Sequence, residues 1–175
     1  MATDRATDSE YLTYQYGDSE KLRIRIEAHE RYSERTGGHF DWILGLLDVR
    51  PSLILVDSGC GPGNAFAPVC RAGARVVGFD FSVGMVREAR QQAGEHELDA
   101  RVFRADAQAI PMADASCDRV LASHMLFHVP DKARALREMR RILRPGGRVV
   151  VTTNAADHAA RLHDLHDEAA RELST

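Results

Sequence analysis

The stretch Ile-Leu-Val-Asp-Ser-Gly-Cys-Gly-Pro-Gly-Asn, residues 54–64, decides the fold of this chain. It begins as an apolar run, reaches an acid at Asp57, and then places glycines at positions 59, 61 and 63. Glycine is needed where the backbone takes a positive φ or lies directly against a ligand, because a Cβ would clash there. The stretch therefore predicts a buried strand that runs directly into a ligand-binding turn.

The spacing of the glycines narrows the kind of ligand. A dinucleotide-binding turn has the pattern Gly-x-Gly-x-x-Gly, whereas the third glycine here, Gly63, comes one residue early. Pro62 also removes one of the N–H donors that a phosphate would use. A P-loop is excluded because no Lys-Ser or Lys-Thr pair follows the glycines. The turn favours a ligand without phosphate, while a nicotinamide-binding domain and a purely structural turn remain as alternatives.

Strand and helix patterns alternate along the rest of the chain. We expect strands at 54–57, 75–79, 101–106, 118–123 and 148–153, with helices at 40–49 and 65–72, after Ser82 and after Asp131. The helix after Asp131 is expected to bury Leu136, Met139 and Leu143 and to stop at residues 145–147. Such alternation implies right-handed crossovers and helices on both faces of a sheet. We predict an α/β, Rossmann-like, doubly wound fold with a mainly parallel sheet of about five strands.

The chain divides into four predicted segments within one domain. Residues 1–10 are expected to form a disordered tail, and 11–50 an N-terminal helical cap that includes a helix over about 19–35. Residues 51–154 form the predicted ligand-binding core. Residues 155–175 are expected to contain an amphipathic helix with an apolar stripe at Leu162, Leu165, Ala169 and Leu173.

Bulk composition excludes several classes of partner. The formal net charge is −3 and the sequence shows no basic stripe, so nucleic acid is not expected. No run approaches the roughly 18 apolar residues of a membrane span, and the N-terminus has no signal-peptide pattern. The three cysteines form no Cys-x-x-Cys pair, which favours a reducing cytoplasm and small buried residues.

Further motifs follow the glycine turn in a familiar order. They are Tyr16-Gly-x-x-x-x-Leu22-x-x-Arg25-Ile26, Val76-x-x-Phe79-Asp80-Phe81-Ser82-x-Gly84-Met85, Ala105-Asp106-Ala107-x-x-Ile110-Pro111, Ser123-His124-Met-Leu-Phe127-His128-Val-Pro-Asp131 and Leu143-Arg-Pro-Gly-Gly147. With the glycine turn, they resemble the ubiquinone/menaquinone-biosynthesis-like branch of the class I S-adenosylmethionine-dependent methyltransferases. The resemblance covers roughly residues 14–165 and implies S-adenosylmethionine as cofactor.

The resemblance also implies a role for each residue of the site. The residues expected to bind the cofactor are Tyr16, Arg25, Asp57, Gly59, Gly61, Gly63, Asp80, Phe81, Met85, Asp106, Ala107 and Ser123. Among them, Asp80 would hold the ribose hydroxyls, and Phe81 and Met85 would flank the adenine. Asp106 would accept from the adenine amino group beside the Ala107 backbone.

Five of these residues have a specified place or an alternative role. Tyr16 and Arg25 are expected to close over the methionine part of the cofactor, and Ser123 to border the methyl group. A structural role for Asp80 or Asp106 and a solvated helix face for Arg25 remain as alternatives.

Methyl transfer from a sulfonium needs orientation and a dry site, and some acceptors also need a base. His124, after the fourth predicted strand, is the candidate base, and His128 is the weaker one; a structural histidine is the alternative. His163 and His166 are of metal-ligand type, but we expect a solvated helix face there and no metal. The predicted function is methyl transfer to a small-molecule acceptor.

The chain departs from the resembled pattern at Ser58, at Ala65-Phe66, where bulkier residues are usual, and in its length. Ser58 stands where a glycine or apolar residue is common, and the usual final antiparallel strands after residue 153 are absent. We therefore expect a truncated or minimal form whose fifth strand is an uncovered edge of the sheet. Such an edge could pair two chains into a homodimer through the C-terminal region. The sequence does not identify the methyl acceptor. A cofactor-binding protein without catalysis is the alternative function, and a nicotinamide oxidoreductase is the weakest candidate.

Overall fold

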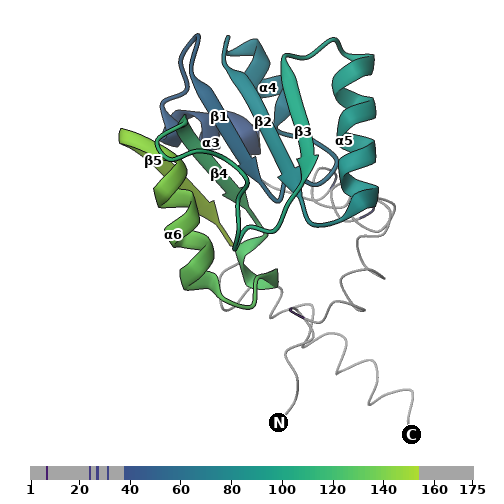
Figure 1. Ribbon diagram of the computed structural model, residues 1–175. Coiled ribbons are helices and arrows are strands. Elements are labelled where there is room, and N and C mark those ends of the chain that lie inside the picture. The colour runs from purple at the N-terminus through teal and green to yellow at the C-terminus, as the bar shows by residue number, and fades with distance from the viewer. Residues whose placement is uncertain (1–6, 8–23, 25–26, 28–30, 32–37, 154–175) are drawn as a thin grey trace, which may run out of the picture.

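Five parallel strands form one sheet in the order β3-β2-β1-β4-β5 (Figure 1). The computed structural model describes residues 38–153 and the isolated positions 7, 24, 27 and 31. The strands are β1 (Ile54–Ser58), β2 (Arg75–Asp80), β3 (Ala100–Arg104), β4 (Cys117–Ser123) and β5 (Leu143–Thr152). The strand order reverses at β1, and in such sheets ligands bind beside this point, at the carboxyl ends of the strands. The predicted fold class is confirmed.

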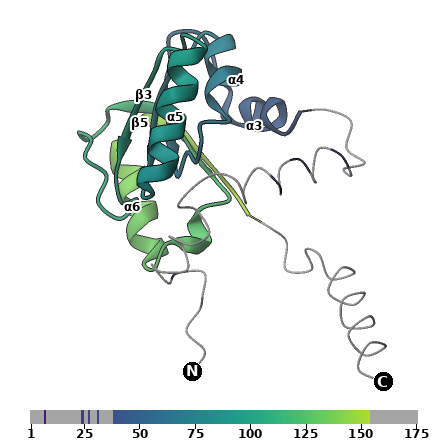
Figure 2. The same cartoon turned by 90° about the vertical axis from the view of Figure 1, so that its right-hand side faces the viewer.

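The helices cover both faces of the sheet. Helices α3 (His39–Leu47), α4 (Phe66–Arg71) and α5 (Val83–Glu95) lie on one face, and α6 (Lys132–Ile142) lies on the other, after the short η2 (Leu126–His128) (Figure 2). Successive residues of β1 point to opposite faces, so Leu55 packs beneath α3 and α4 while Val56 packs on the α6 side. A parallel sheet that is buried on both faces needs this nearly continuous apolar sequence.

Two of the predicted helix starts are confirmed by their caps. The Ser82 hydroxyl accepts from the Met85 N–H at 3.3 Å, and the Asp131 carboxylate accepts from the Arg134 N–H at 2.8 Å. Each bond satisfies one N–H group that the first helical turn leaves without an internal acceptor. The helices therefore begin where the chain leaves the carboxyl edge of the sheet.

The prediction for the start of the fifth strand was wrong. Strand β5 begins at Leu143, five residues before the predicted position. Leu143 pairs with Cys117 and Arg148 pairs with Arg119, so the proline-glycine-glycine segment between them forms an irregularity inside the strand. Gly146 takes a φ of 78°, a value that glycine adopts without strain. Helix α6 therefore ends at Ile142, three residues before the segment that was predicted to stop it, and Leu143 already pairs in the sheet.

The predicted buried face of α6 was also partly wrong. The helix buries Ala135, Met139 and Ile142, whereas Leu136 is 42% exposed. The buried residues follow the i, i+4, i+7 stripe of a helix, and Leu136 lies about 100° around the axis from Ala135. The small Ala135 lets the helix approach the sheet closely, and Leu136 is left on the outer side.

The predicted segments at both ends lie outside the described residues. They are the tail at 1–10 and the helix at 19–35, apart from the isolated positions given above, and the C-terminal segment at 155–175. Their predicted conformations stay predictions. Within the part of the chain that the structure describes, no helix is long and apolar enough to cross a membrane.

Ser58, at the end of β1, generates a prediction about stability. Its hydroxyl is fully buried and has no hydrogen-bond partner among the described residues. A buried hydroxyl without a partner costs about 1–3 kcal/mol, so we expect Ser58→Ala to raise the free energy of unfolding by about 1 kcal/mol. Ser123→Ala is the matched control, because its hydroxyl is paired with Thr152 at 3.0 Å and its loss should destabilise. Urea unfolding of both variants tests this, and a destabilised Ser58→Ala would contradict it.

Candidate functional site

The glycine turn at the carboxyl end of β1 has the backbone that its sequence predicts. Gly59, Gly61 and Gly63 have φ values of 69°, 54° and 91°, where residues with a Cβ are strained. A Cβ on Gly59 would lie 2.7 Å from the Cβ of Met125, and one on Gly63 would lie 2.8 Å from the ring of Phe66. Packing of neighbouring side chains therefore requires two of these glycines, whatever ligand binds.

The N–H groups of this turn have acceptors inside the protein. Those of Gly59 and Cys60 both donate to the Phe79 carbonyl, at 2.8 and 3.0 Å. The Gly61 N–H donates to Asp80 Oδ2 at 2.9 Å, and Gly63 donates to the Cys60 carbonyl at 3.0 Å. Proline at position 62 has no N–H to offer. An anion site needs N–H groups that point at the ligand, and residues 59–63 provide none.

Asp80 joins the glycine turn to the turn that follows β2. While Oδ2 accepts from Gly61, Oδ1 accepts from the Ser82 N–H at 2.8 Å. Burial raises the pKa of Asp80, and these backbone N–H groups act in the opposite direction. A carboxylate offers about four acceptor positions, so it can still accept from hydroxyl groups of a ligand. The position is the one predicted for a ribose-binding acid.

Asp57 places a second carboxyl group beneath the same turn. It is 3% exposed, and burial, with a smaller contribution from the charge of Asp80, raises its pKa from 3.8 to about 7. The Asp80 carboxylate repels a pyrophosphate, Asp57 adds to this repulsion where it is ionised, above about pH 7, and the pair suits a neutral or cationic ligand. The bonded N–H groups and the carboxyl groups therefore both disfavour a ligand that contains phosphate.

The raised pKa of Asp57 predicts how stability depends on pH. The folded state binds this proton more tightly than the unfolded state, so the contribution of Asp57 to stability is greatest below about pH 4. It falls as the pH rises to about 7 and then levels off. One pKa unit is worth about 1.4 kcal/mol, so Asp57→Asn should raise the free energy of unfolding by about 1–4 kcal/mol at pH 8 and by about a quarter of that at pH 4.5. A gain of equal size at both pH values would show that Asp57 does not titrate in this window.

Gln92 of α5 supports the glycine turn and was missed by the sequence analysis. With its amide nitrogen facing the turn, it donates to the carbonyl oxygens of Pro62 and Gly63 at 2.7 and 3.1 Å. It stands 29 residues from Gly63 in the sequence, and nothing in the local pattern of the helix marks it. Only the fold brings it to the turn.

Gln92→Leu removes these two bonds with little change of volume. We expect it to weaken S-adenosylhomocysteine binding by about 5- to 150-fold, because hydrogen bonds between neutral groups are worth about 0.5–1.5 kcal/mol each and two are lost. Gln91→Leu is the matched control, since the Gln91 amide instead donates to Glu95 on the exposed face. Calorimetry on both variants gives the comparison. Equal affinities would mean that the Gln92 bonds do not shape the turn.

A second group of residues lies at the carboxyl ends of β4 and β5. The hydroxyls of Ser123 and Thr152 are 3.0 Å apart, and the His124 N–H donates to the Thr152 carbonyl at 3.0 Å. His124 has a φ of 52°, an uncommon value for a residue with a Cβ, and such strain occurs often at functional sites. The ring of His39 lies 5.9 Å from that of His124, centroid to centroid, a neighbour that the sequence analysis missed.

Phe81 and Met85, the two residues predicted to flank a ligand ring, differ in access. Phe81 is 54% exposed, as a stacking residue requires, and the Arg104 guanidinium lies 5.3 Å from its ring centroid. Met85 is buried in the protein interior, so it presents no open surface in this conformation. Its predicted contact stays a prediction.

The predicted adenine-binding segment after β3 makes contacts within the protein. The Asp106 carboxylate accepts from the Gln108 backbone N–H at 2.8 Å and from the Gln108 amide at 3.1 Å. Ala107 is buried. These contacts hold the segment in place and agree with the structural alternative for Asp106, while its predicted ligand contact stays a prediction. Tyr16 and Arg25 lie outside the described residues.

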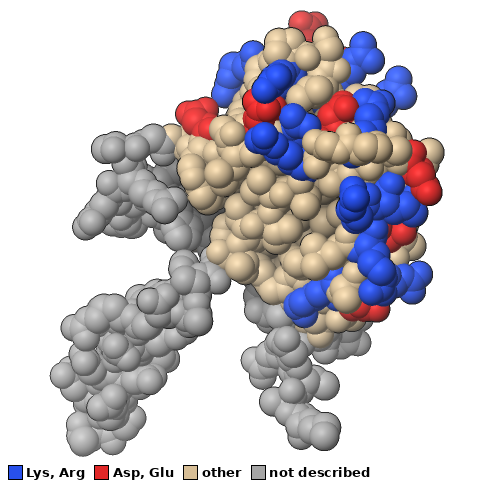
Figure 3. Space-filling model, turned by 90° about the vertical axis from the view of Figure 1, so that its left-hand side faces the viewer, with Lys and Arg blue, Asp and Glu red and all other residues tan. Residues whose placement is uncertain are grey.

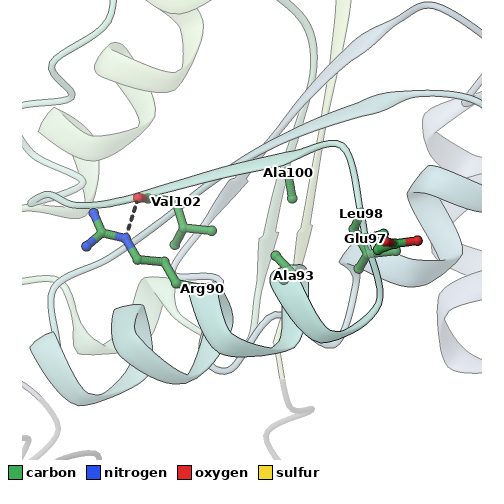
Figure 4. A pocket seen from close by; sticks show the side chains of 7 residues that line it. Arg90, Ala93, Glu97, Leu98, Ala100 and Val102 are labelled. Atoms are coloured by element: carbon green, nitrogen blue, oxygen red, sulfur yellow. Dashed lines mark hydrogen bonds between the residues drawn. The ribbon is translucent and has the colours of Figure 1, made fainter.

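A cavity of about 460 Å³ lies elsewhere, between α5 and β3 (Figure 4). Its lining includes Arg90, Glu97 and Val102, and the Arg90 Nε donates to the Val102 carbonyl at 2.9 Å. None of the predicted site residues lines it. Within residues 38–153 and the four isolated positions, no group of three or more metal-ligand side chains is present.

The chain matches a family model described as a methyltransferase domain over residues 56–151, more than half of its length. This match runs from β1 into β5 and includes every described site residue named above except His39 and Thr152. The chain therefore belongs to this methyltransferase family, as the resemblance to class I S-adenosylmethionine-dependent enzymes predicted. Its cofactor is S-adenosylmethionine, whose lack of phosphate fits a turn that has neither free N–H groups nor positive charge.

The chain is similar to two relatives and to one solved structure. Methyltransferase GfsG of Streptomyces halstedii is 35% identical over 148 residues, which are 83% of this chain and 50% of the relative. The 27-O-demethylrifamycin SV methyltransferase of Amycolatopsis mediterranei is 34% identical over 81% of this chain and 50% of its own. The [4+2]-cyclase SpnF is 29% identical, with a TM-score of 0.63 over 65% of this chain and 43% of its own. The chain thus spans about half the length of these curated relatives.

Proposed function

We propose that the chain transfers a methyl group from S-adenosylmethionine to a small-molecule acceptor. The observation that carries the proposal is the pair of carboxyl groups, Asp57 and Asp80, at a glycine turn whose N–H groups are already bonded, within a methyltransferase domain. Such a site disfavours phosphate-containing cofactors. A relative that is named for methylating demethylrifamycin supports a small-molecule acceptor.

The cofactor supplies a methyl group on a positively charged sulfur, which is reactive toward a nucleophile in line with the bond that breaks. In this proposal Asp80 accepts from the ribose hydroxyls and Phe81 stacks on the adenine. Asp106 binds the adenine amino group if the Gln108 amide gives way. Tyr16 and Arg25 close over the methionine part.

His124 borders the acceptor beside Ser123 and takes its proton where the acceptor needs a base. The strained φ of His124 and its position at the end of β4 support this role. The imidazole is suited to it because its unperturbed pKa lies near neutral pH.

A second candidate function is cofactor binding without methyl transfer. The similarity to SpnF, which is named a [4+2]-cyclase, supports this alternative because it ties the same fold to another reaction. A fold alone does not determine the reaction of its site.

We also propose a homodimer that forms through the outer edge of β5, in a reducing cytoplasm. Strand β5 is the last of the described sheet, and Val149 and Val151 are 43% and 38% exposed on it. Exposed apolar strands at an edge favour pairing with another chain. The three cysteines are free thiols, which supports the compartment. Light scattering that gives a monomer mass at tens of micromolar protein would reject the dimer.

The cofactor assignment predicts a clear order of affinities. S-adenosylhomocysteine should bind in calorimetry and NAD should not. Asp80→Asn should weaken this binding by about 1.5–3 kcal/mol, the range for hydrogen bonds to a charged group. Asp99→Asn, at an exposed acid before β3, is the control and should bind as the wild type does. Tighter binding of NAD than of S-adenosylhomocysteine would end the methyltransferase assignment.

Activity is tested by formation of S-adenosylhomocysteine with a panel of phenols, amines and thiols. We expect turnover with at least one acceptor, and His124→Ala should then lower kcat more than it raises the KM for the cofactor. Cofactor binding without turnover on any acceptor would favour the non-catalytic alternative. An unchanged kcat in the variant would exclude His124 as the base.

A further inference from the structure

Helix α6 and the start of β5 gather positive charge that the net charge of the chain conceals. Residues 131–148 contain seven basic and two acidic residues, although the whole chain carries a formal −3. Figure 3 shows Lys and Arg side chains over the top and along the right-hand side of this view, with Asp and Glu among them, beside a central surface without charged residues. The sequence analysis found no basic stripe because it weighed the chain as a whole.

Some of these cations are held by acids of the same chain. Arg141 contacts Glu138 at 2.8 Å and Asp114 at 2.7 Å, and Arg144 contacts Asp118 at 2.7 Å. The Arg141–Asp114 pair fixes α6 to the loop before β4, and the Arg144–Asp118 pair joins the start of β5 to β4. They leave little of their charge for a partner.

The remaining cations of α6 are exposed, and one of them, Lys132, donates from its Nζ to the Val129 carbonyl at 3.3 Å. Lys132, Arg134, Arg137 and Arg140 are all exposed. Within residues 38–153, the first two and Arg140 have no ion pair, and the nearest acid to Arg137, Asp131, lies at the 4.0 Å limit. We name these four residues and Leu136 the outer face of α6.

Leu136 gives this face an apolar centre. It is 42% exposed and lies one helical turn from both Lys132 and Arg140. An exposed apolar residue among arginines is typical of protein interfaces, where a buried anchor is surrounded by a polar rim. Nucleic-acid surfaces depend on phosphate contacts and do not need such an anchor. The face therefore favours an acidic protein.

The outer face begins beside the candidate site. Helix α6 starts at Lys132, four residues after η2 and eight after His124 at the end of β4. Its 11 residues span about 16 Å, and its N-terminal end lies at the carboxyl edge of the sheet. A protein bound along α6 would hold a flexible group near His124 and Ser123.

We propose that the outer face of α6 docks a small acidic protein, by an acidic helix whose apolar residue covers Leu136. Opposite charges would steer the encounter, and the contact with Leu136 would set its orientation. The docking surface is inferred from the charges and the exposure of the side chains of α6. Its role, delivery of the methyl acceptor on a flexible arm, rests on the proposed function.

The test uses an acyl carrier protein in its apo form as probe, because it is small and strongly acidic. Its affinity for the full chain is measured by fluorescence anisotropy at about 50 mM and about 300 mM salt, since screening separates electrostatic docking from apolar contact. We expect binding at low salt that weakens by about tenfold or more at high salt. Leu136→Ser should weaken it by about threefold or more.

Charge reversal on two faces separates docking from net charge. Arg134→Glu/Arg137→Glu/Arg140→Glu should weaken probe binding by about tenfold or more, as expected when repulsion replaces attraction. The matched control, Arg71→Glu/Arg87→Glu/Arg101→Glu, changes the net charge equally at exposed arginines of α4, α5 and β3, and should change affinity by less than about twofold. Both variants should keep the melting temperature and S-adenosylhomocysteine affinity of the wild type, which are read separately.

Three results would overturn the proposal. They are no binding of the probe at low salt, equal loss of binding in the two triple variants, and binding of a DNA duplex of about 20 base pairs as tight as that of the probe. The last result would assign the face to nucleic acid. If the wild type does not bind S-adenosylhomocysteine, that result contradicts the proposed function. The docking surface is then accepted or rejected on the probe-binding results alone.

Discussion

The hydrogen bond from the Gly61 N–H to the Asp80 carboxylate is the contact on which the site depends. It joins the turn after β1 to the end of β2, and the Phe79 carbonyl strengthens this junction by accepting from Gly59 and Cys60. The two strands already pair in parallel, so their carboxyl ends are held in one rigid unit. Because each N–H group of the turn is used in this way, the turn binds a ligand by shape and by its carboxyl groups, and phosphate finds no donor there.

The same arrangement makes the site less stable than the sheet around it. Asp57 is buried under the turn with Asp80 nearby, and its raised pKa shows that ionising it is unfavourable in the folded protein. The left-handed backbone of His124 adds strain at the end of β4. Both features lie at the carboxyl edge, where sheets of this topology bind ligands, and the packed strands behind them supply the stability they lack. Strain at functional sites that is offset elsewhere in the fold is a general pattern.

Much of the fold follows from the sequence because its signals are local. The apolar run and glycines of residues 54–64, the caps at Ser82 and Asp131, and the strand that ends at Asp80 depend on near neighbours only. The start of β5 was mispredicted because a proline-glycine-glycine segment usually ends an element, and here it forms an irregularity within a strand. Leu136 was misplaced because periodicity shows which residues share a face but not how closely a small residue such as Ala135 lets the helix approach.

The residues that sequence reasoning missed depend on contacts between distant segments. Gln92 contacts the glycine turn from α5, the helix that follows β2, and His39 lies beside His124 from α3, the helix that precedes β1. The sequence already contains the excess of basic residues over 131–148, and the structure adds which of those on the outer face of α6 are exposed and without an ion pair within residues 38–153. For Asp106 the motif predicted a contact with the ligand. In the structure its carboxylate instead accepts a hydrogen bond from Gln108 of the same chain.

The central claim is that the glycine turn takes a cofactor without phosphate because its N–H groups are bonded within the protein. Amide chemical shifts of Gly61 and Ser82 measure this directly, with S-adenosylhomocysteine and ADP-ribose compared at equal concentration. We predict that S-adenosylhomocysteine shifts both amides and that ADP-ribose leaves them unchanged. Binding of ADP-ribose with a large shift of the Gly61 amide would show that this N–H group is free to hold a phosphate, and would contradict the account.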